Sequence, residues 1–429
     1  MTISRGYWIA LVMAVSACSS QRYLNVQVLQ AEKDFKDHIG LVLYDPVKRK
    51  TIYNHRGDRY FTPASNTKIF TFYASLQLLG DSVPALRYVQ RNDSLIFWGT
   101  GDPGFLYENT KGETSVFNFL RTHPSNLFFS SDNFQAEHFG PGWAWDDYNY
   151  DFQVERTPFP IYGNRVLVKK VGETFVSPPG VFQYSLSDPT KTKERPEMIR
   201  NIGTNGVQYI PGRTTRPTEW SLPFRYSDDL LAKLLSDTLK REVKLISRSL
   251  SPDSKIYYSG SPDSLYQEMM QESDNFIAEQ LLLVCAEKVS DTLRSEIAID
   301  YVKKKYLFDL PDEPVWVDGS GLSRYNLFTP RSIVRLWEKI YALVPRDRLL
   351  RLLAVGGESG TLKNYYKGDS PYIFGKTGTL SNNHALSGYL VTKRGHTLIF
   401  SWMNNNFAAS ASDVRKRMEI VLKKIYETY

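Results

Sequence analysis

The stretch FTPASNTKIFTFYASLQLLG, residues 61–80, combines a candidate nucleophile, a candidate base and the start of a predicted helix. Thr62 suits a helix N-cap, and Pro63 suits the first helical position. Apolar residues then recur at helical spacing until the final glycine. Ser65 and Lys68 are three residues apart, so the predicted helix places both side chains on one face.

These two side chains suggest nucleophilic catalysis. A serine hydroxyl is a weak nucleophile until a neighbouring base takes its proton, and Lys68 is such a base if burial or nearby cations lower its pKa. The positive end of the helix dipole also favours the anion that develops on Ser65. Ser-x-x-Lys alone leaves an alternative open, a capped amphipathic helix with a solvated lysine.

A second motif, Ser-Asp-Asn-Phe-x-Ala-Glu, occurs twice, at residues 131–137 and 273–279. The first copy follows a strand-like run and leads into a loop rich in proline and glycine, which predicts a turn at Ser131. The second copy interrupts a helical stretch, where a short loop can direct Ser273 and Asn275 at a neighbouring helix. We therefore favour the second copy as part of the site.

A third motif, Lys-Thr-Gly-Thr, begins at Lys376 on the predicted strand PYIFGKTGTL. Gly378 allows a substrate backbone to approach the strand closely. Lys376 offers a positive charge to a substrate carboxylate. The alternative is a lysine of the kind that is common on edge strands.

The three motifs together resemble the signature of penicillin-recognising serine enzymes. From about Gly40 to the C-terminus, the chain is similar to low-molecular-mass class C penicillin-binding proteins, the D-alanyl-D-alanine carboxypeptidases and endopeptidases of peptidase family S13. Further stretches that carry the resemblance are GTGDP (99–103), GWAWDD (142–147), DGSGLSRYN (318–326), ESGTL (358–362) and NNNF (404–407). The resemblance implies an α+β fold, with a transpeptidase-like and β-lactamase-like core whose antiparallel sheet lies between helical layers.

The resemblance also implies catalytic roles. Ser65 would attack the penultimate D-alanine carbonyl to form an acyl-enzyme, and Lys68 would receive its proton. Ser273 would relay a proton between Lys68, Lys376 and the leaving amine, and Asn275 would orient Lys68. No physical role for the stretch 318–326 is evident from the sequence.

Substrate binding is implied at two places. The terminal carboxylate would be held by the third motif, through Lys376, Thr377, Gly378 and Thr379. The free amine of the stem peptide's diamino acid would be bound by Asp147 and Phe152, although the alignment also allows Asp146. In the same aromatic run, GPGWAWDDYNYDF, we expect Trp143, Trp145 and Phe152 to be packing anchors of an inserted domain.

Composition divides the chain further. Residues 88–223 contain many short alternating segments, prolines and aromatic loops, which predicts an inserted β-rich domain, as one unit or two. Helical patterns and three final strand-like runs flank it, so we expect a discontinuous transpeptidase-like catalytic domain formed by residues 38–87 and 224–429.

The first residues, MTISRGYWIALVMAVSAC, have an arginine, a short apolar run and then small residues, which predicts a signal peptide over residues 1–17. Val15–Cys18 resembles the bacterial lipobox, in which the cysteine is lipidated; a plain signal peptide cut nearby is the alternative. We therefore expect residues 18–37 to be a lipid-anchored tether that holds the protein in the periplasm. Ser19, at the next position, favours the outer membrane.

Charge and residue types limit the other classes. The net charge of +7 would suit binding to an anionic wall polymer, but an ordinary basic surface explains it equally well. The sequence has no Lys/Arg-rich run of the kind that indicates nucleic-acid binding. The six histidines are scattered without His-Glu-x-x-His, which argues against a zinc amidase. We expect no metal and no other cofactor. The expected partners are peptidoglycan stem peptides and β-lactams. Two alternatives are a β-lactamase, for which no deacylating glutamate is evident, and a slowly deacylating sensor or scaffold.

Overall fold

A computed structural model of the chain describes residues 21–110, 114–177, 180, 182–187 and 191–429. Cys18 and the predicted signal peptide lie outside the described residues. Among the described residues, no helix has the length and apolar character needed to cross a membrane. Residues 21–35 are helical, and Leu24, Val28 and Ala31 are buried against the sheet described next. This part of the predicted tether is therefore packed on the core.

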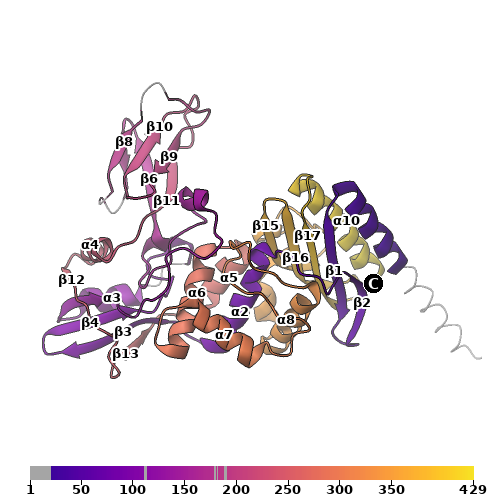
Figure 1. Ribbon diagram of the computed structural model, residues 1–429, viewed down its shortest axis with the longest axis horizontal. Coiled ribbons are helices and arrows are strands. Elements are labelled where there is room, and N and C mark those ends of the chain that lie inside the picture. Colours follow the sequence, from indigo (N-terminus) through magenta and orange to yellow (C-terminus); the bar gives the residue numbers. More distant parts are fainter. Residues whose placement is uncertain (1–20, 111–113, 178–179, 181, 188–190) are drawn as a thin grey trace, which may run out of the picture.

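The core contains a six-stranded antiparallel sheet in the order β14-β15-β16-β17-β1-β2 (Figure 1). Its strands are β14 (Ala354–Val355), β15 (Ile373–Leu380), β16 (Asn383–Val391), β17 (Thr397–Asn405), β1 (His38–Asp45) and β2 (Lys50–His55). Strands β16 and β17 are buried along nearly their whole length, because helices cover both faces of the sheet.

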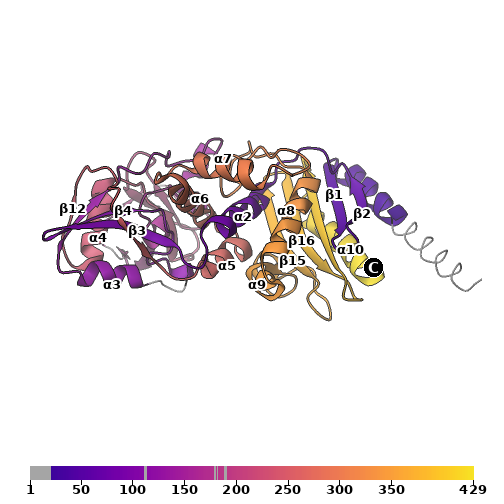
Figure 2. The same cartoon turned by 90° about the horizontal axis from the view of Figure 1, so that it is seen from below.

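Two hydrophobic clusters separate the layers. On one face, residues 21–35 and α10 (Ala411–Thr428) pack on side chains such as Leu41 and Leu386. On the other face, Val42 and Ala385 belong to the same hydrophobic cluster as the main helical layer. Figure 2 shows this layer and α10 on opposite sides of the sheet. That layer contains α2 (Lys68–Leu78), α5 (Asp263–Gln271), α6 (Asn275–Ser290), α7 (Ser295–Tyr306), α8 (Pro330–Leu343) and α9 (Arg346–Leu352). The predicted antiparallel sheet between helical layers is confirmed.

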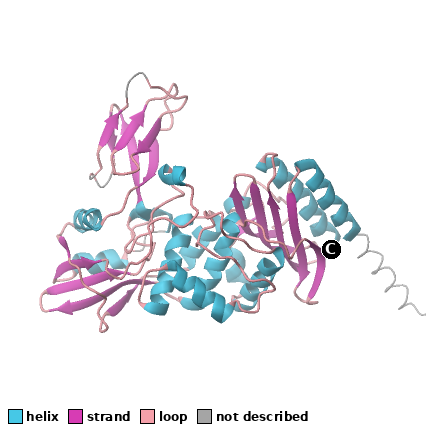
Figure 3. Cartoon of the chain, viewed as in Figure 1, coloured by secondary structure: helices cyan, strands magenta, loops and turns pink. Residues whose placement is uncertain are grey.

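The inserted region contains a five-stranded sheet and a smaller β lobe (Figure 3). The sheet order is β12-β5-β4-β3-β13, with bounds β12 (Val243–Leu245), β5 (Asn126–Ser130), β4 (Ser94–Gly99), β3 (Pro84–Arg91) and β13 (Lys255–Tyr258). The helices α3 (Ser115–Thr122) and α4 (Asp228–Leu239) share one hydrophobic cluster with the five-stranded sheet. The lobe has two three-stranded sheets: β8 (Tyr184–Leu186), β10 (Val207–Ile210) and β9 (Glu197–Arg200); and β11 (Glu219–Pro223), β6 (Arg165–Val171) and β7 (Thr174–Val176).

Strand pairing extends the insertion beyond the predicted limits of 88–223. β3 begins at Pro84 and pairs with β13, which ends at Tyr258. α4 lies between these strands in sequence and buries Leu234 and Leu235 in the cluster of the insertion. Its helical periodicity predicts the return of the catalytic domain, but periodicity does not show which sheet the apolar face contacts. One continuous cluster also contains side chains from both the five-stranded sheet and the lobe.

Helix α6 joins the insertion to the core. The side chain of Gln280 donates to the carbonyl oxygens of Gly101 and Thr157, each at 2.9 Å. Arg87 of β3 donates to the Glu287 carboxylate at 2.7 Å. The insertion therefore contacts the helix whose first residues belong to the second motif.

Candidate active site

Ser65 lies in a short 3-10 turn, Ala64–Thr67, that precedes α2. The predicted helix start at Thr62 is wrong, because the Thr62 amide donates to Asn405 Oδ1 at 2.8 Å and Ala64 has φ +49°. A positive φ is uncommon at a residue other than glycine, and strained backbone of this kind clusters at active sites. The turn nevertheless keeps Ser65 next to Lys68, the first residue of α2.

The Lys68 ammonium contacts the nucleophile directly. Its Nζ donates to Ser65 Oγ at 3.0 Å, to Asn275 Oδ1 at 2.6 Å and to the Ser320 carbonyl at 2.7 Å. Burial lowers the pKa of Lys68 to about 8, although Asp318 and other carboxylates nearby oppose the shift. Two of the partners can only accept, so a neutral Lys68 uses both hydrogens on them and directs its lone pair at the Ser65 hydroxyl.

Ser273 and Lys376 form a second contact beside this pair. Ser273 lies between α5 and α6 with φ +69°, and Lys376 Nζ donates to Ser273 Oγ at 2.8 Å. Lys376 is fully buried, which excludes the edge-strand alternative. Burial and the nearby Lys68 hold the pKa of Lys376 well below its usual value. Both lysines therefore have a larger neutral fraction than a solvated lysine.

The first copy of the repeated motif is elsewhere. Ser131 follows β5 and donates to Asp228 Oδ2 at 2.6 Å, and the Asn133 side chain donates to the Gly99 carbonyl at 2.8 Å. Both contacts lie within the insertion, between β3 and β13 in the sequence. The structure thus places the second copy beside Lys68, as predicted, and the first copy in a turn.

The structure gives a second reason for glycine at position 378, besides the predicted approach of a substrate backbone. A Cβ at this position would lie 2.5 Å from the Pro63 carbonyl oxygen and 2.8 Å from the Ser65 amide nitrogen. The turn that carries Ser65, Ala64–Thr67, therefore lies directly against β15 at Gly378. Thr377 Oγ1 donates to Thr361 Oγ1 at 2.7 Å, and Thr379 is exposed at the cleft.

The loop at residues 318–326 supports Lys68, a role that the sequence did not reveal. Asp318 is fully buried and its carboxylate accepts four hydrogen bonds. The donors are Gly321 N at 2.9 Å, Ser323 N at 2.7 Å, Asn326 Nδ2 at 2.7 Å and Trp143 Nε1 at 2.9 Å. These bonds fix the loop whose Ser320 carbonyl accepts from Lys68.

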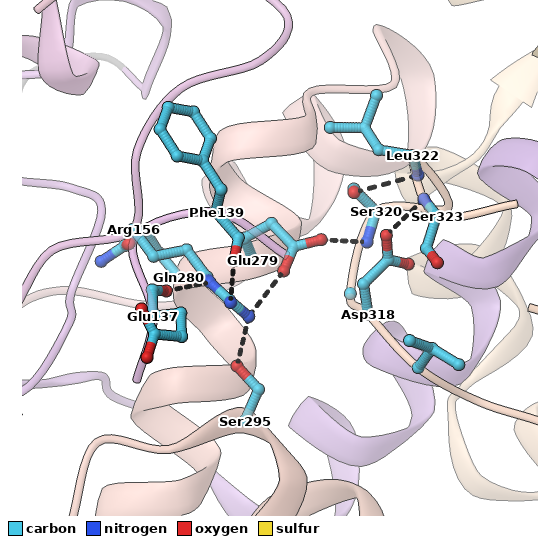
Figure 4. A network of polar contacts seen from close by, with 12 residues as sticks. Glu137, Phe139, Arg156, Glu279, Gln280, Ser295, Asp318, Ser320, Leu322 and Ser323 are labelled. Carbon is cyan, nitrogen blue, oxygen red and sulfur yellow. Dashed lines mark hydrogen bonds and ion pairs between the residues drawn. The ribbon is translucent and has the colours of Figure 1, made fainter. Parts of the chain in front are cut away.

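A second buried carboxylate holds the same loop from the side of α6 (Figure 4). Glu279 Oε1 accepts from the Ser320 amide at 2.7 Å, and Glu279 Oε2 lies 3.7 Å from Arg156 Nη1. Arg156 also donates to the carbonyl oxygens of Glu137 and Phe139. Burial raises the pKa of Glu279 to about 7. Both copies of the repeated motif therefore contact Arg156 of the insertion.

An open cleft of about 760 Å³ exposes these groups. Its lining includes Ser65, Ser273, Asn275 and Thr379. Asp147 and Phe152 of the insertion and Arg324 of the 318–326 loop also line it. The structure brings the three motifs together on one cleft, with the predicted diamino-acid residues on its wall.

Asp147 lies in a 3-10 turn, Trp145–Asn149, where burial and the adjacent Asp146 raise its pKa while Arg324 opposes the shift. Asp147 is half-buried and lines the cleft, which favours it over the exposed Asp146. Arg324 is a cleft residue that the sequence reasoning missed.

The prediction that Trp145 is a packing anchor is wrong, because 76% of its surface is exposed. Phe152 is also 40% exposed and stacks on Tyr150 with ring centroids 5.3 Å apart. Of the three side chains, that of Trp143 has an anchoring hydrogen bond, to Asp318. Aromatic density in the sequence does not show which rings face solvent.

Comparisons with known proteins agree with this geometry. A profile of the D-Ala-D-Ala carboxypeptidase 3 (S13) family matches residues 23–425. D-alanyl-D-alanine carboxypeptidase DacB of Haemophilus influenzae is 22% identical over 433 residues, which cover 90% of this chain and 89% of that protein. The D-alanyl-D-alanine carboxypeptidase of Actinomadura sp. strain R39 is 24% identical over 424 residues, which cover 87% of this chain and 78% of that protein.

The crystal structure of penicillin binding protein 4 (dacB) from Haemophilus influenzae has a TM-score of 0.74 at 21% identity. The match covers 91% of this chain and 97% of that one, which confirms the predicted α+β fold. The family profile spans nearly the whole chain, and the predicted resemblance is confirmed. This chain is therefore a serine D-Ala-D-Ala carboxypeptidase that belongs to the D-Ala-D-Ala carboxypeptidase 3 (S13) family.

Proposed function

We propose that the carboxypeptidase reaction runs through an acyl-enzyme on Ser65, with Lys68 as the base. The observation that carries this proposal is the set of contacts of Lys68 Nζ with Ser65 Oγ, Asn275 Oδ1 and the Ser320 carbonyl. Because the last two can only accept, they take the two hydrogens of a neutral amine and leave its lone pair for the Ser65 hydroxyl. Ser65 Oγ attacks the carbonyl of the penultimate D-alanine, and its proton passes to Lys68.

The leaving D-alanine needs a proton on its amine nitrogen. In the proposed step, Lys68 gives the proton that it took from Ser65 to the Ser273 hydroxyl, and Ser273 gives its own proton to the leaving amine, so that Lys68 is neutral again; Lys376 Nζ, 2.8 Å from Ser273 Oγ, orients that hydroxyl. The peptide C–N bond breaks, D-alanine leaves, and the acyl group stays on Ser65. Water then attacks the ester carbonyl while neutral Lys68 takes one proton of that water. The bond between the acyl carbon and Ser65 Oγ breaks, Lys68 returns the proton to Ser65 Oγ, and the shortened peptide leaves as the free acid.

The test is release of D-alanine from a purified pentapeptide stem peptide by the wild type and by Ser65→Ala. We expect release by the wild type and none by the variant. Equal release from both would exclude Ser65 as the nucleophile. Covalent labelling by a fluorescent penicillin without D-alanine release would instead indicate the slowly deacylating sensor.

Asp147 and Phe152 are proposed to bind the free amine of the diamino acid in the stem peptide. The support is the half-buried carboxylate of Asp147 on the cleft wall, because a partly desolvated carboxylate gains from a cationic partner. The exposed face of Phe152 lies on the same wall and can contact the aliphatic part of the side chain.

Asp147→Ala should weaken cleavage of peptides with a free diaminopimelate amine and leave penicillin acylation within a few-fold of wild type. Asp146→Ala is the matched control, because Asp146 is adjacent but exposed. Equal loss on a substrate whose side-chain amine is acetylated would mean that Asp147 is only structural.

β-Lactams are proposed as covalent inhibitors at Ser65. A solved structure of the Haemophilus influenzae protein is a complex with a β-lactam. The strained lactam carbonyl would occupy the place of the scissile peptide, so labelling and D-alanine release should be lost together in Ser65→Ala.

We also propose that Cys18 carries a lipid that anchors the protein to a membrane facing the periplasm. The support is the sequence Val15–Cys18, which resembles a lipobox. Metabolic labelling with an alkyne fatty acid should mark the wild type but not Cys18→Ser. Equal labelling of both, or of neither, would exclude the anchor.

A further inference from the structure

Arg415 connects the C-terminal helix to the third motif. It lies on α10, which packs on the sheet beside β16 (Figure 1). Its Nη2 donates to Thr379 Oγ1 at 3.2 Å, and its guanidinium lies 5.9 Å from the centroid of the Tyr365 ring. The side chain is half-buried. A permanently charged group from a distant part of the sequence therefore contacts the exposed end of the Lys-Thr-Gly-Thr strand.

The guanidinium has no counter-ion in the described part of the chain. Two residues further along α10, Arg417 pairs with Asp34 at 2.8 Å, whereas no described carboxylate lies at ion-pair distance from Arg415. An arginine has five N–H donors in a rigid fork, and the bond to Thr379 uses one of them. Arg415 thus retains donors and a full positive charge beside the cleft.

Lys376 is badly placed to supply that charge alone. It is fully buried, and its Nζ donates to Ser273 Oγ and to the Thr377 carbonyl, both at 2.8 Å. Burial and Lys68 also keep its pKa well below the usual value. A substrate carboxylate that reaches Thr379 therefore contacts a hydroxyl that is hydrogen-bonded to Arg415, whereas the Lys376 amine is buried behind the strand surface.

His384 completes this arrangement from β16. Its Nδ1 lies 2.9 Å from Thr379 Oγ1, and burial together with Arg415 lowers the pKa of His384 to about 3, so the ring is neutral. If Nδ1 carries the proton, His384 and Arg415 both donate to Thr379, and the threonine hydrogen is free for a carboxylate. If Nδ1 is unprotonated, Thr379 donates to His384 and Arg415 is the donor left for the carboxylate. Either tautomer leaves a donor for an anion.

We propose that Arg415 is a specificity-determining residue, whose positive charge beside Thr379 selects substrates that end in a free carboxylate. This inference rests on the proposed function, because it concerns the group next to the bond that Ser65 cleaves. It assigns the carboxylate preference to a residue on the terminal helix, outside all three motifs.

The experiment compares two peptides that differ only at the C-terminus, an acyl-D-Ala-D-Ala free acid and its C-terminal amide. In Arg415→Gln, kcat/KM for the acid should fall about ten-fold, as expected for losing one charge a few ångströms from the carboxylate at the edge of the protein. The value for the amide should stay near that of the wild type. Arg415→Lys keeps the charge and should recover most of the acid rate.

Lys416→Gln is the matched control, since it removes the same charge from the next residue, whose side chain is exposed. It should leave the ratio of acid to amide rates unchanged. Equal losses for both peptides in Arg415→Gln, or an unchanged ratio, would overturn the assignment. A wild type that releases D-alanine from neither peptide would instead refute the proposed function itself.

Discussion

Asp318→Asn tests whether the 318–326 loop positions Lys68, because it replaces one oxygen of the buried Asp318 carboxylate by an NH2 group and changes little else in the loop. The wild-type carboxylate accepts from four N–H donors and is fully buried. An asparagine has only one acceptor oxygen, so its amide group faces two of those donors. Two charge-assisted bonds are lost and two buried N–H groups are left without an acceptor.

Each such bond contributes about 1.5–3 kcal/mol, and relief of the buried charge offsets part of the loss. We therefore expect the free energy of unfolding to fall by about 3 kcal/mol. The second consequence is electrostatic. Asp318 raises the pKa of Lys68 against the effect of burial, so removing its charge lowers that pKa below about 8.

Two measurements follow on the same variant, chemical denaturation and the rate of penicillin acylation as a function of pH. Asp318→Asn should unfold at lower denaturant, and the rising limb of its acylation profile should move to lower pH. Trp143→Phe removes one donor and keeps the charge, so it should lose only about 1 kcal/mol and leave the limb in place. Wild-type stability together with an unmoved limb in Asp318→Asn would refute this reasoning.

Three further predictions concern the same site. Ser273→Ala should lower penicillin acylation by orders of magnitude while Ser131→Ala leaves it nearly unchanged, and the reverse result would mean that the first copy of the motif is the functional one. Because only neutral Lys68 accepts a proton, the wild-type acylation rate should rise about ten-fold per pH unit and level off near pH 8; a flat profile between pH 6 and 9 would exclude Lys68 as the base. Gly321→Ala places a Cβ 1.9 Å from the Ala64 carbonyl oxygen at φ +85°, so stopped-flow acylation should be severely slowed, and a wild-type rate would show that the nucleophile turn tolerates displacement.

The three motifs were predictable from sequence because their chemistry resides in residue type and short spacing. Ser65 and Lys68 needed only to be one helical turn apart, and a 3-10 turn preserves that proximity even though the predicted helix start was wrong. The choice between Ser273 and Ser131 was also possible, because local context separates a loop between helices from a turn after a strand.

The supporting residues were not predictable in this way. Asp318 and Glu279 act through partners that are far away in the sequence, and nothing local to either residue shows that the Ser320 carbonyl reaches Lys68. Arg415 is one of two arginines on an amphipathic helix rich in basic residues, and only the packing of α10 brings it to Thr379. The limits of the insertion also required strand pairing, since α4 has a helical pattern that fits either part of the chain.

The most direct test of the mechanism is to locate the covalent adduct. The purified protein is incubated with benzylpenicillin, digested and analysed by mass spectrometry, in parallel with Ser65→Ala. The wild type should carry one penicilloyl group on the peptide that contains Ser65, and the variant should carry none. An adduct on another residue of the wild type, or an undiminished adduct in the variant, would contradict the assignment of Ser65 as the nucleophile.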